Sequence, residues 1–154
     1  MKYRKAEKAD LDQVVRVAST AFEDYLFLKV IKDLVRDPKQ YPAFVEAMMR
    51  ILVKVFLKHY ICLVAEKNDE IYAVALLQKG PIPFRAYLLN GGFGLLKFIS
   101  LKNMLSYFKF MEDTDKEFEQ NVDFDWYLML LAVAPKHQLQ GYWSRFMAVG
   151  IEPF

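Results

Sequence analysis

The sequence predicts a mixed α/β fold in which a mainly antiparallel sheet is flanked by helices. Three observations predict this class. Two apolar runs, 60–65 and 71–77, are separated by a short polar turn, which is typical of a β-hairpin. A third run, 126–133, carries no formal charge and precedes Pro135 and a polar loop with one glycine. Elsewhere, apolar residues recur at the spacing of amphipathic helices.

The N-terminal segment is expected to form a short strand and then a capped helix. Lys2 to Ala6 is the strand candidate. Asp10 is the expected N-cap of the helix, and Gln13, three residues later, completes an imperfect capping box. Apolar residues then recur at helical spacing from Leu11 to Phe22.

Two more helical patterns precede the hairpin. The first covers 25–35 and is broken at Asp37-Pro38. The second begins near Pro42, which suits a first helical turn, and continues to about Lys58. Residues 68–70 form the expected hairpin turn, and the uncharged run 126–133 is expected to be a strand buried on both faces.

The long connection 80–124 predicts a helical insertion. Short helices are expected at 95–99 and 101–111, then a solvated turn at 112–115 and one further helical turn at 116–122. Long structured connections are often functional, so the insertion is either a lid over an acceptor site or an aromatic seal on the sheet. Its scattered basic residues fit a solvated face or, alternatively, contact with an acidic acceptor or a membrane surface. These residues are Arg85, Lys97, Lys102 and Lys109.

The segment that follows 126–133 has the features of an anion site. A strand that runs through a polar loop into a helix leaves the first N–H groups of that helix without internal partners. The helix macrodipole favours negative charge at the same end. The expected ligand is a phosphate or pyrophosphate.

Gln138, Gly141 and the helix after them resemble the coenzyme A loop of the GNAT N-acetyltransferases, whose pattern is Gln/Arg-x-x-Gly-x-Gly/Ala. The strand that ends at Val133 resembles the fourth strand of that family. The resemblance implies that an acetyl group is transferred from acetyl-coenzyme A, the co-substrate, to a primary amine. It also implies that the strand pairs with the pantetheine arm while the loop amides hold the pyrophosphate. The implied cofactor-binding residues are Leu131, Ala132, Val133, Gln138, Leu139, Gln140, Gly141, Tyr142, Trp143 and Ser144.

Two features depart from the family pattern. Trp143 stands where the family has a second glycine or alanine, which lets the backbone approach the phosphates closely. The sequence also stops at Phe154, about three turns into the helix expected from Gly141. The family's later strands and helix have no counterpart, so we expect an incomplete GNAT-like domain. An apolar strand 126–133 that lacks its neighbour is expected to pair with a second chain, which predicts a homodimer.

Acyl transfer requires an uncharged amine. A lysine-like amine has a pKa near 10.4, so only about one molecule in a thousand is neutral at pH 7. In the family, a carboxylate on or near the fourth strand commonly acts as the general base. Tyr127 stands where histone-type members carry glutamate, and Asp123 and Asp125 are the nearest carboxylates. Asp125 and Tyr127 are therefore the candidate catalytic residues, with Glu66 a more distant candidate.

Other reactive side chains are expected to have structural roles. Cys62 lies in an expected strand, which favours a buried, inert thiol. His137 is expected to face solvent, and Ser144 to be a hydroxyl in the first helical turn. His59 follows a helix, where capping is the default role. Two distant histidines do not predict a metal site.

Length and composition restrict the class of protein. The 154 residues, 55% of them hydrophobic, predict one domain, 1–154, with a sizeable core. The 21 basic and 19 acidic residues nearly balance, which argues against a nucleic-acid binder. The sequence shows no signal peptide and no run of about 18 apolar residues, so a cytoplasmic protein without a membrane span is expected.

The leading hypothesis is therefore a GNAT-type N-acetyltransferase. The alternative is a catalytically inactive, truncated acetyltransferase-like module for binding or dimerisation. A peripheral lipid-binding protein that uses the aromatic insertion is a third reading. The acceptor stays open among amino sugars, polyamines, peptide N-termini and drugs.

Overall fold

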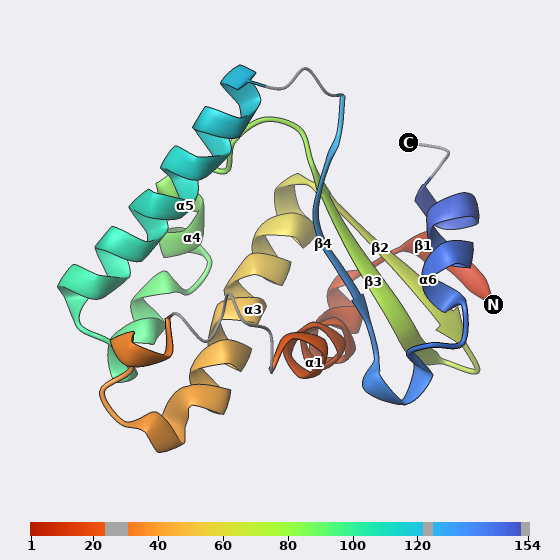
Figure 1. The fold of residues 1–154 in the computed structure, drawn as a ribbon, viewed down its shortest axis with the longest axis horizontal. Helices are drawn as coiled ribbons and strands as arrows, with labels where there is room; N and C mark the ends of the chain where they lie inside the picture. The colour runs from red at the N-terminus through yellow and green to blue at the C-terminus, as the bar shows by residue number, and fades with distance from the viewer. Residues whose placement is uncertain (24–30, 122–124, 152–154) are drawn as a thin grey trace.

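A computed structural model of the chain describes residues 1–23, 31–121 and 125–151. Four strands form one antiparallel sheet in the order β1-β2-β3-β4. The strands are β1 (Lys2–Lys5), β2 (Ile61–Lys67), β3 (Glu70–Gln78) and β4 (Tyr127–Val133). Helices flank this sheet, which confirms the predicted mixed α/β class (Figure 1).

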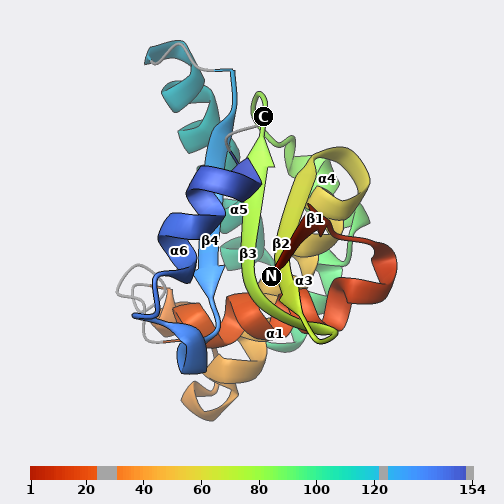
Figure 2. The ribbon, with the colours of Figure 1, turned by 90° about the vertical axis from the view of Figure 1, so that its right-hand side faces the viewer.

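The helices form unequal layers on the two faces of the sheet. On one face lie α1 (Leu11–Phe22) and α3 (Tyr41–His59). Beyond α3 are α4 (Phe84–Leu89), a 3₁₀ segment (Gly92–Lys97) and the long α5 (Leu101–Asn121). On the opposite face lie α6 (Tyr142–Arg145) and the π-helical turns Phe146–Ile151 (Figure 2). Further 3₁₀ turns are Lys8–Asp10, Lys32–Leu34, Pro38–Gln40 and Pro135–His137.

Each face of the sheet has its own core. The larger core joins the sheet to α1, α3, α4 and α5, and fully buried residues such as Phe44 and Phe56 belong to it. The smaller core gathers Leu63, Ala75 and Leu77 around Phe146, whose ring stacks on Tyr3 with the centroids 5.7 Å apart. Burial of apolar side chains on both faces stabilises the centre of the sheet.

The prediction that 126–133 is buried on both faces is wrong. In β4, only Leu130 and Ala132 are buried, at 7% and 2% exposure. The reason is position, because β4 is the edge strand of the sheet within the described residues. The strand buried on both faces is β3, in which all residues from Ala73 to Gln78 are buried.

The N-terminal strand, the hairpin and α3 form where the sequence predicted them. In α3, Pro42 occupies the first turn as expected. Asn68 and Asp69 have positive φ values of 52° and 60°, and they form a two-residue turn between Lys67 and Glu70. Two left-handed residues give the turn whose twist matches that of the flanking strands.

The predicted solvated turn at 112–115 is wrong, because α5 continues through it. Its carboxylates have partners that the sequence does not reveal. Within the helix, Lys109 pairs with Asp113 at 3.0 Å (Nζ to Oδ1). The Phe84 backbone N–H donates to Glu112 at 2.6 Å, and the Gln78 side-chain amide donates to Asp115 at 3.2 Å. These carboxylates therefore fasten α5 to the end of β3 and the start of α4.

The remaining parts of the insertion join the larger core. Tyr87 of α4 and Phe108 of α5 are buried and stack at 5.1 Å between centroids. The helix expected at 95–99 is the 3₁₀ segment Gly92–Lys97. The end of the expected turn at 116–122, and Asp123, lie outside the described residues, as does most of the helical pattern at 25–35. In the described ranges, no helix is long and apolar enough to cross a membrane.

Asp10 does not cap α1 through its side chain. It accepts hydrogen bonds from the Glu7 backbone N–H at 2.7 Å and from two nitrogens of Arg4, at 2.6 and 3.0 Å. The same guanidinium bonds Glu66 of β2. Arg4 thereby ties β1 to both β2 and the start of α1. Gln13, the expected partner in the capping box, instead bonds the hairpin, accepting from the Ile71 N–H at 3.1 Å.

The Arg4 network makes the stability of the fold depend on pH. Its hydrogen bonds to Asp10 hold the pKa of that carboxyl below its usual range. A group with a depressed folded-state pKa stabilises the fold above its unfolded pKa of about 4, and this contribution is lost as the pH falls through the lower folded value. We expect Asp10→Asn to reduce the free energy of unfolding by about 1.5 to 3 kcal/mol at pH 7, the usual worth of hydrogen bonds to a charged group.

Urea unfolding followed by circular dichroism measures this difference, which should shrink as the pH is lowered below the unfolded pKa. The matched control is Asp12→Asn. Its carboxylate pairs with Arg50 but is 77% exposed, so a change below about 1 kcal/mol is expected. Equal losses in the two variants would contradict the assignment.

Candidate functional site

A groove of about 420 Å³ lies where β4 ends and α6 begins. Three segments line it: the end of α1 with Ala21 and Phe22, the last three residues of β4, and the segment that leads into α6. Figure 1 shows these segments next to one another although they are far apart in the sequence. Eight residues implied by the resemblance line the groove: Leu131, Ala132, Val133, Gln138, Leu139, Gly141, Tyr142 and Ser144.

Of the other two implied residues, only Gln140 has a side chain that the structure describes. The side-chain amide of Gln140 donates to the Lys136 carbonyl at 3.1 Å, within its own loop. Trp143 lies in α6, but its side chain is outside what the structure describes, so the fit of its indole beside a cofactor remains a prediction.

The loop after β4 is held in shape by its own polar side chains. The Gln138 amide donates to the Val133 carbonyl at 3.1 Å, which folds the loop back onto the strand end. Leu139 and Gly141 have positive φ values of 63° and 74°, so two residues of this short loop are in the left-handed region. Glycine adopts this conformation without strain, whereas Leu139 does so at a cost. Leu139 is fully exposed at the tip of the loop.

An aromatic stack fixes the loop to the neighbouring strand. The His137 ring lies parallel to Tyr72 of β3, with centroids 3.7 Å apart, and Tyr142 meets both rings edge-on. The Ala134 N–H donates to the Tyr72 carbonyl at 2.8 Å. The expectation that His137 faces solvent is therefore wrong, because the ring is half-buried and lines the groove. The expectation failed because the sequence alone does not give the pairing of β3 with β4, which brings Tyr72 beside the loop.

Some residues that line this groove have backbone amides without protein acceptors. In the described part of the chain, no acceptor is found for the N–H groups of Leu139, Gly141 and Tyr142. The α-helical part that follows is only four residues long and continues as π-helical turns, instead of the three α-turns expected. Attraction for an anion therefore comes from local N–H dipoles more than from a long helix macrodipole.

The candidate catalytic residues lie away from the groove. Asp125 is exposed and precedes β4, six residues before Leu131, a separation of about 20 Å in an extended chain. Tyr127 pairs with Gln78 at the start of β4, and its ring packs on Phe118 at 4.9 Å between centroids. The more distant candidate, Glu66, is engaged by Arg4 near the opposite edge of the sheet. The structure does not bring these side chains to the loop after β4.

Other reactive groups have structural surroundings. Burial raises the pKa of Cys62 to about 12, so the thiol stays protonated and is not a nucleophile. Among the described residues, no group of three or more His, Cys, Asp or Glu side chains has the arrangement of a metal site.

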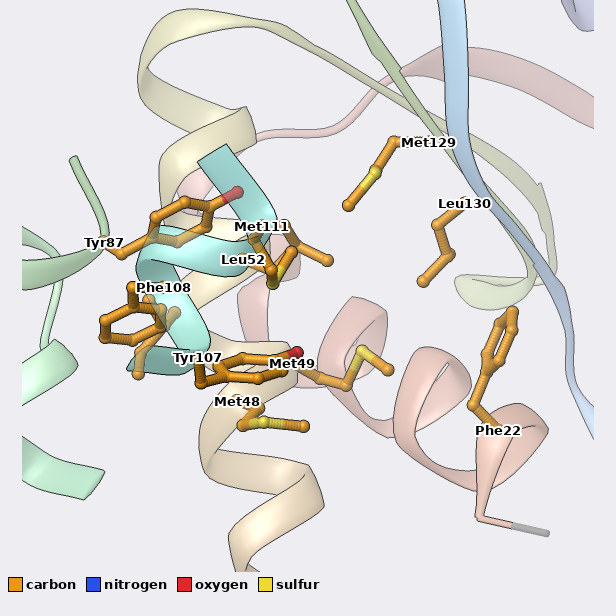
Figure 3. Close-up of a pocket in the computed structure, with 11 residues that line it drawn as sticks. Phe22, Met48, Met49, Leu52, Tyr87, Tyr107, Phe108, Met111, Met129 and Leu130 are labelled. Atoms are coloured by element: carbon orange, nitrogen blue, oxygen red, sulfur yellow. The ribbon is translucent and has the colours of Figure 1, made fainter. Parts of the chain in front are cut away.

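A second, apolar cavity adjoins the groove across Phe22. Its volume is about 160 Å³, and it lies between β4 and the helices α1, α3, α4 and α5 (Figure 3). Phe22 lines both spaces. Neither space is lined by a carboxylate among the described residues.

Comparison with known proteins identifies the fold. No protein-family model and no curated protein sequence matches the chain. A solved structure described as histone acetyltransferase HPA2 and related acetyltransferase, from Corynebacterium glutamicum, superposes with a TM-score of 0.59 at 19% identity. The match covers 99% of this chain and 70% of that one. The fold is that of a GNAT-like acetyltransferase. At this identity the likeness concerns the fold, and the chemistry rests on the site.

The left-handed conformation of Gly141 gives a test of the loop. An added Cβ would meet nothing within 4 Å, so the cost of Gly141→Ala is conformational alone. We expect a loss of about 1 to 2 kcal/mol in the free energy of unfolding, measured by urea denaturation. Gly141→Asn should lose less, since asparagine tolerates this conformation. Gly94→Ala is the control, because Gly94 also has open space but no positive φ, and it should lose nothing.

Proposed function

We propose that this chain binds an acyl-coenzyme A, with acetyl-coenzyme A as the expected form, and transfers the acyl group to a primary amine. One observation carries the proposal. A groove at the open end of an edge strand is lined by Leu139, Gly141 and Tyr142, whose backbone N–H groups have no acceptor among the described residues. The GNAT-like fold supports it, because the groove lies at the end of β4 that the resemblance assigns to the cofactor.

The edge of β4 suits an extended ligand. β3 occupies one side of β4, and the sheet has no strand on the other side within the described ranges. A peptide-like arm with alternating donors and acceptors can bind such an edge as an added strand. The pantetheine arm has this character, with two amides, and would run along Leu131–Val133 toward the loop. The diphosphate would then meet the N–H groups from Leu139 to Tyr142.

The chain's own groups would assist transfer by orientation and polarisation. Holding the thioester along β4 places its carbonyl near the backbone N–H groups around Val133, which can stabilise the developing oxyanion. The amine must lose its proton, and the lining of the two spaces described above contains no carboxylate. Apolar walls assist this step because desolvation disfavours the ammonium form and lowers the pKa of the amine. Water in the open groove can accept the proton.

Calorimetric titration with acetyl-coenzyme A tests the proposal. We expect saturable binding and, with an amine present, release of free thiol. Gly141→Ala should weaken binding because it distorts the amide loop, whereas Gly94→Ala should not. Trp143→Gly should bind at least as tightly as the parent chain, because a small residue lets the backbone approach the phosphates. Absence of heat at millimolar cofactor, in the parent chain and in Trp143→Gly alike, would exclude the proposal.

A non-catalytic binding or dimerisation module is the second candidate, favoured by the exposed edge of β4. We propose that two copies pair through this edge, since an unpaired apolar strand attracts another strand. Edge pairing and binding of the pantetheine arm compete for the same backbone groups, so a bound cofactor is expected to dissociate a dimer that pairs through β4.

Light scattering across micromolar to millimolar protein concentrations measures the mass. A dimer would have twice the chain mass of 18.1 kDa. Added coenzyme A should shift an edge-paired dimer toward the monomer. A monomer at all concentrations would rule out self-association, and a dimer that is insensitive to a bound cofactor would rule out pairing through β4.

A further inference from the structure

The apolar cavity beside the groove is built mainly from flexible thioethers and aromatic rings. Four of the seven methionines of the chain line it, from α3, α5 and β4: Met48, Met49, Met111 and Met129. Phe22, Ile51, Leu52, Tyr87, Tyr107, Phe108 and Leu130 complete the lining. Figure 3 shows these side chains converging from the helices and from β4. The wall is therefore hydrocarbon and sulfur, apart from the hydroxyls of two tyrosines.

The size of the cavity fits a small hydrocarbon group. An engineered apolar cavity of about 150 Å³ stays dry and binds benzene. The present cavity has about the same volume, 160 Å³. A phenyl ring or a chain of about six carbons therefore matches the space.

A β-bulge in β4 lets two neighbouring side chains of this strand line the cavity. Leu76 of β3 pairs with Leu130, and the next residue, Leu77, pairs with Leu128, so Met129 is the extra residue. In a regular strand, neighbouring side chains point to opposite faces. Because of the bulge, both Met129 and Leu130 line the same cavity. Bulges often re-aim a side chain next to a functional site.

The cavity also has a buried polar atom without a partner. The Tyr87 hydroxyl is buried and has no hydrogen-bond partner among the described residues. Desolvation keeps it protonated by raising the pKa of Tyr87 above its usual value. An unpaired buried hydroxyl is uncommon in a native core, so its presence is consistent with a space that a ligand fills.

We propose that this cavity holds the hydrocarbon group of the acceptor amine, so that the acceptor is a primary amine bearing a phenyl ring or a chain of similar size. This inference rests on the proposed function. Two reactants need two spaces, and Phe22 borders both the groove and the cavity. With the carrier in the groove, an amine anchored in the cavity would present its nitrogen toward the carrier beside Phe22. An acetyl group is too small to need a cavity of this volume.

Methionine methyl NMR tests the site directly, without requiring turnover. Phenethylamine should shift the methyl signals of Met48, Met49, Met111 and Met129. The signals of Met1 and Met147, which do not line the cavity, should stay in place. Ethanolamine, which has the primary amine but no ring or longer chain, should leave the signals of all seven methionines unchanged.

A filled cavity provides the matched comparison. Met111→Trp places a larger ring in the space and should reduce phenethylamine affinity at least tenfold. Leu105→Trp is the control on the same helix, because Leu105 is 39% exposed and does not line the cavity. If Met111→Trp does not fold, Leu52→Phe serves the same purpose from α3. Equal affinity in the filled and control variants would overturn the proposal.

Changing the acyl-coenzyme A donor tests whether the hydrocarbon group in the cavity belongs to the acceptor amine or to the acyl chain. With acetyl-coenzyme A, kcat/KM for phenethylamine should exceed that for ethanolamine at least tenfold, and Met111→Trp should remove this preference. If hexanoyl-coenzyme A shifts the four methyl signals while phenethylamine does not, the cavity holds the acyl chain and the proposal is wrong. Failure of the proposed function gives a different result, because coenzyme A then gives no heat while phenethylamine still shifts the methyl signals.

Discussion

The antiparallel pairing of β4 with β3, including the bulge at Met129, is the constraint on which both candidate spaces depend. The pairing of Ala73 with Val133 is the last in the ladder between β3 and β4. The hydrogen bond from the Ala134 N–H to the Tyr72 carbonyl then holds the first residue of the loop against β3. The loop must therefore leave the sheet beside the hairpin, where the His137 ring stacks on Tyr72. The bulge lies within the same strand, and both Met129 and Leu130 beside it line the apolar cavity. One ladder of hydrogen bonds thus places both spaces.

Local patterns predicted the elements whose signals are local. The hairpin turn at Asn68 and Asp69, and the helix that begins near Pro42, depend on residues close to one another in sequence. The strand–loop–helix signal also indicated the groove, because most of its lining comes from one segment. The remaining wall of the groove comes from the end of α1, and no pattern at 126–144 indicates that Phe22 lies next to β4.

The misassigned residues share one physical cause, which is a partner that the local sequence pattern does not reveal. Asp10 looked like a helix cap, but Arg4 and the Glu7 N–H bind its carboxylate. The acidic residues at 112–115 looked like a solvated turn, but backbone and amide donors from 78–84 bind two of them. The edge position of β4 likewise depends on the order of strands, which composition does not encode.

The walls of the apolar cavity have a consequence for selectivity. Unbranched thioether side chains have three rotatable bonds and a polarisable sulfur, so they can change rotamer to pack against ligands of different shape. An apolar cavity with such walls selects ligands by hydrophobicity more strictly than by shape. It would accept rings, branched chains and linear chains of similar volume. Breadth of this sort is characteristic of proteins that deal with a whole chemical series of compounds.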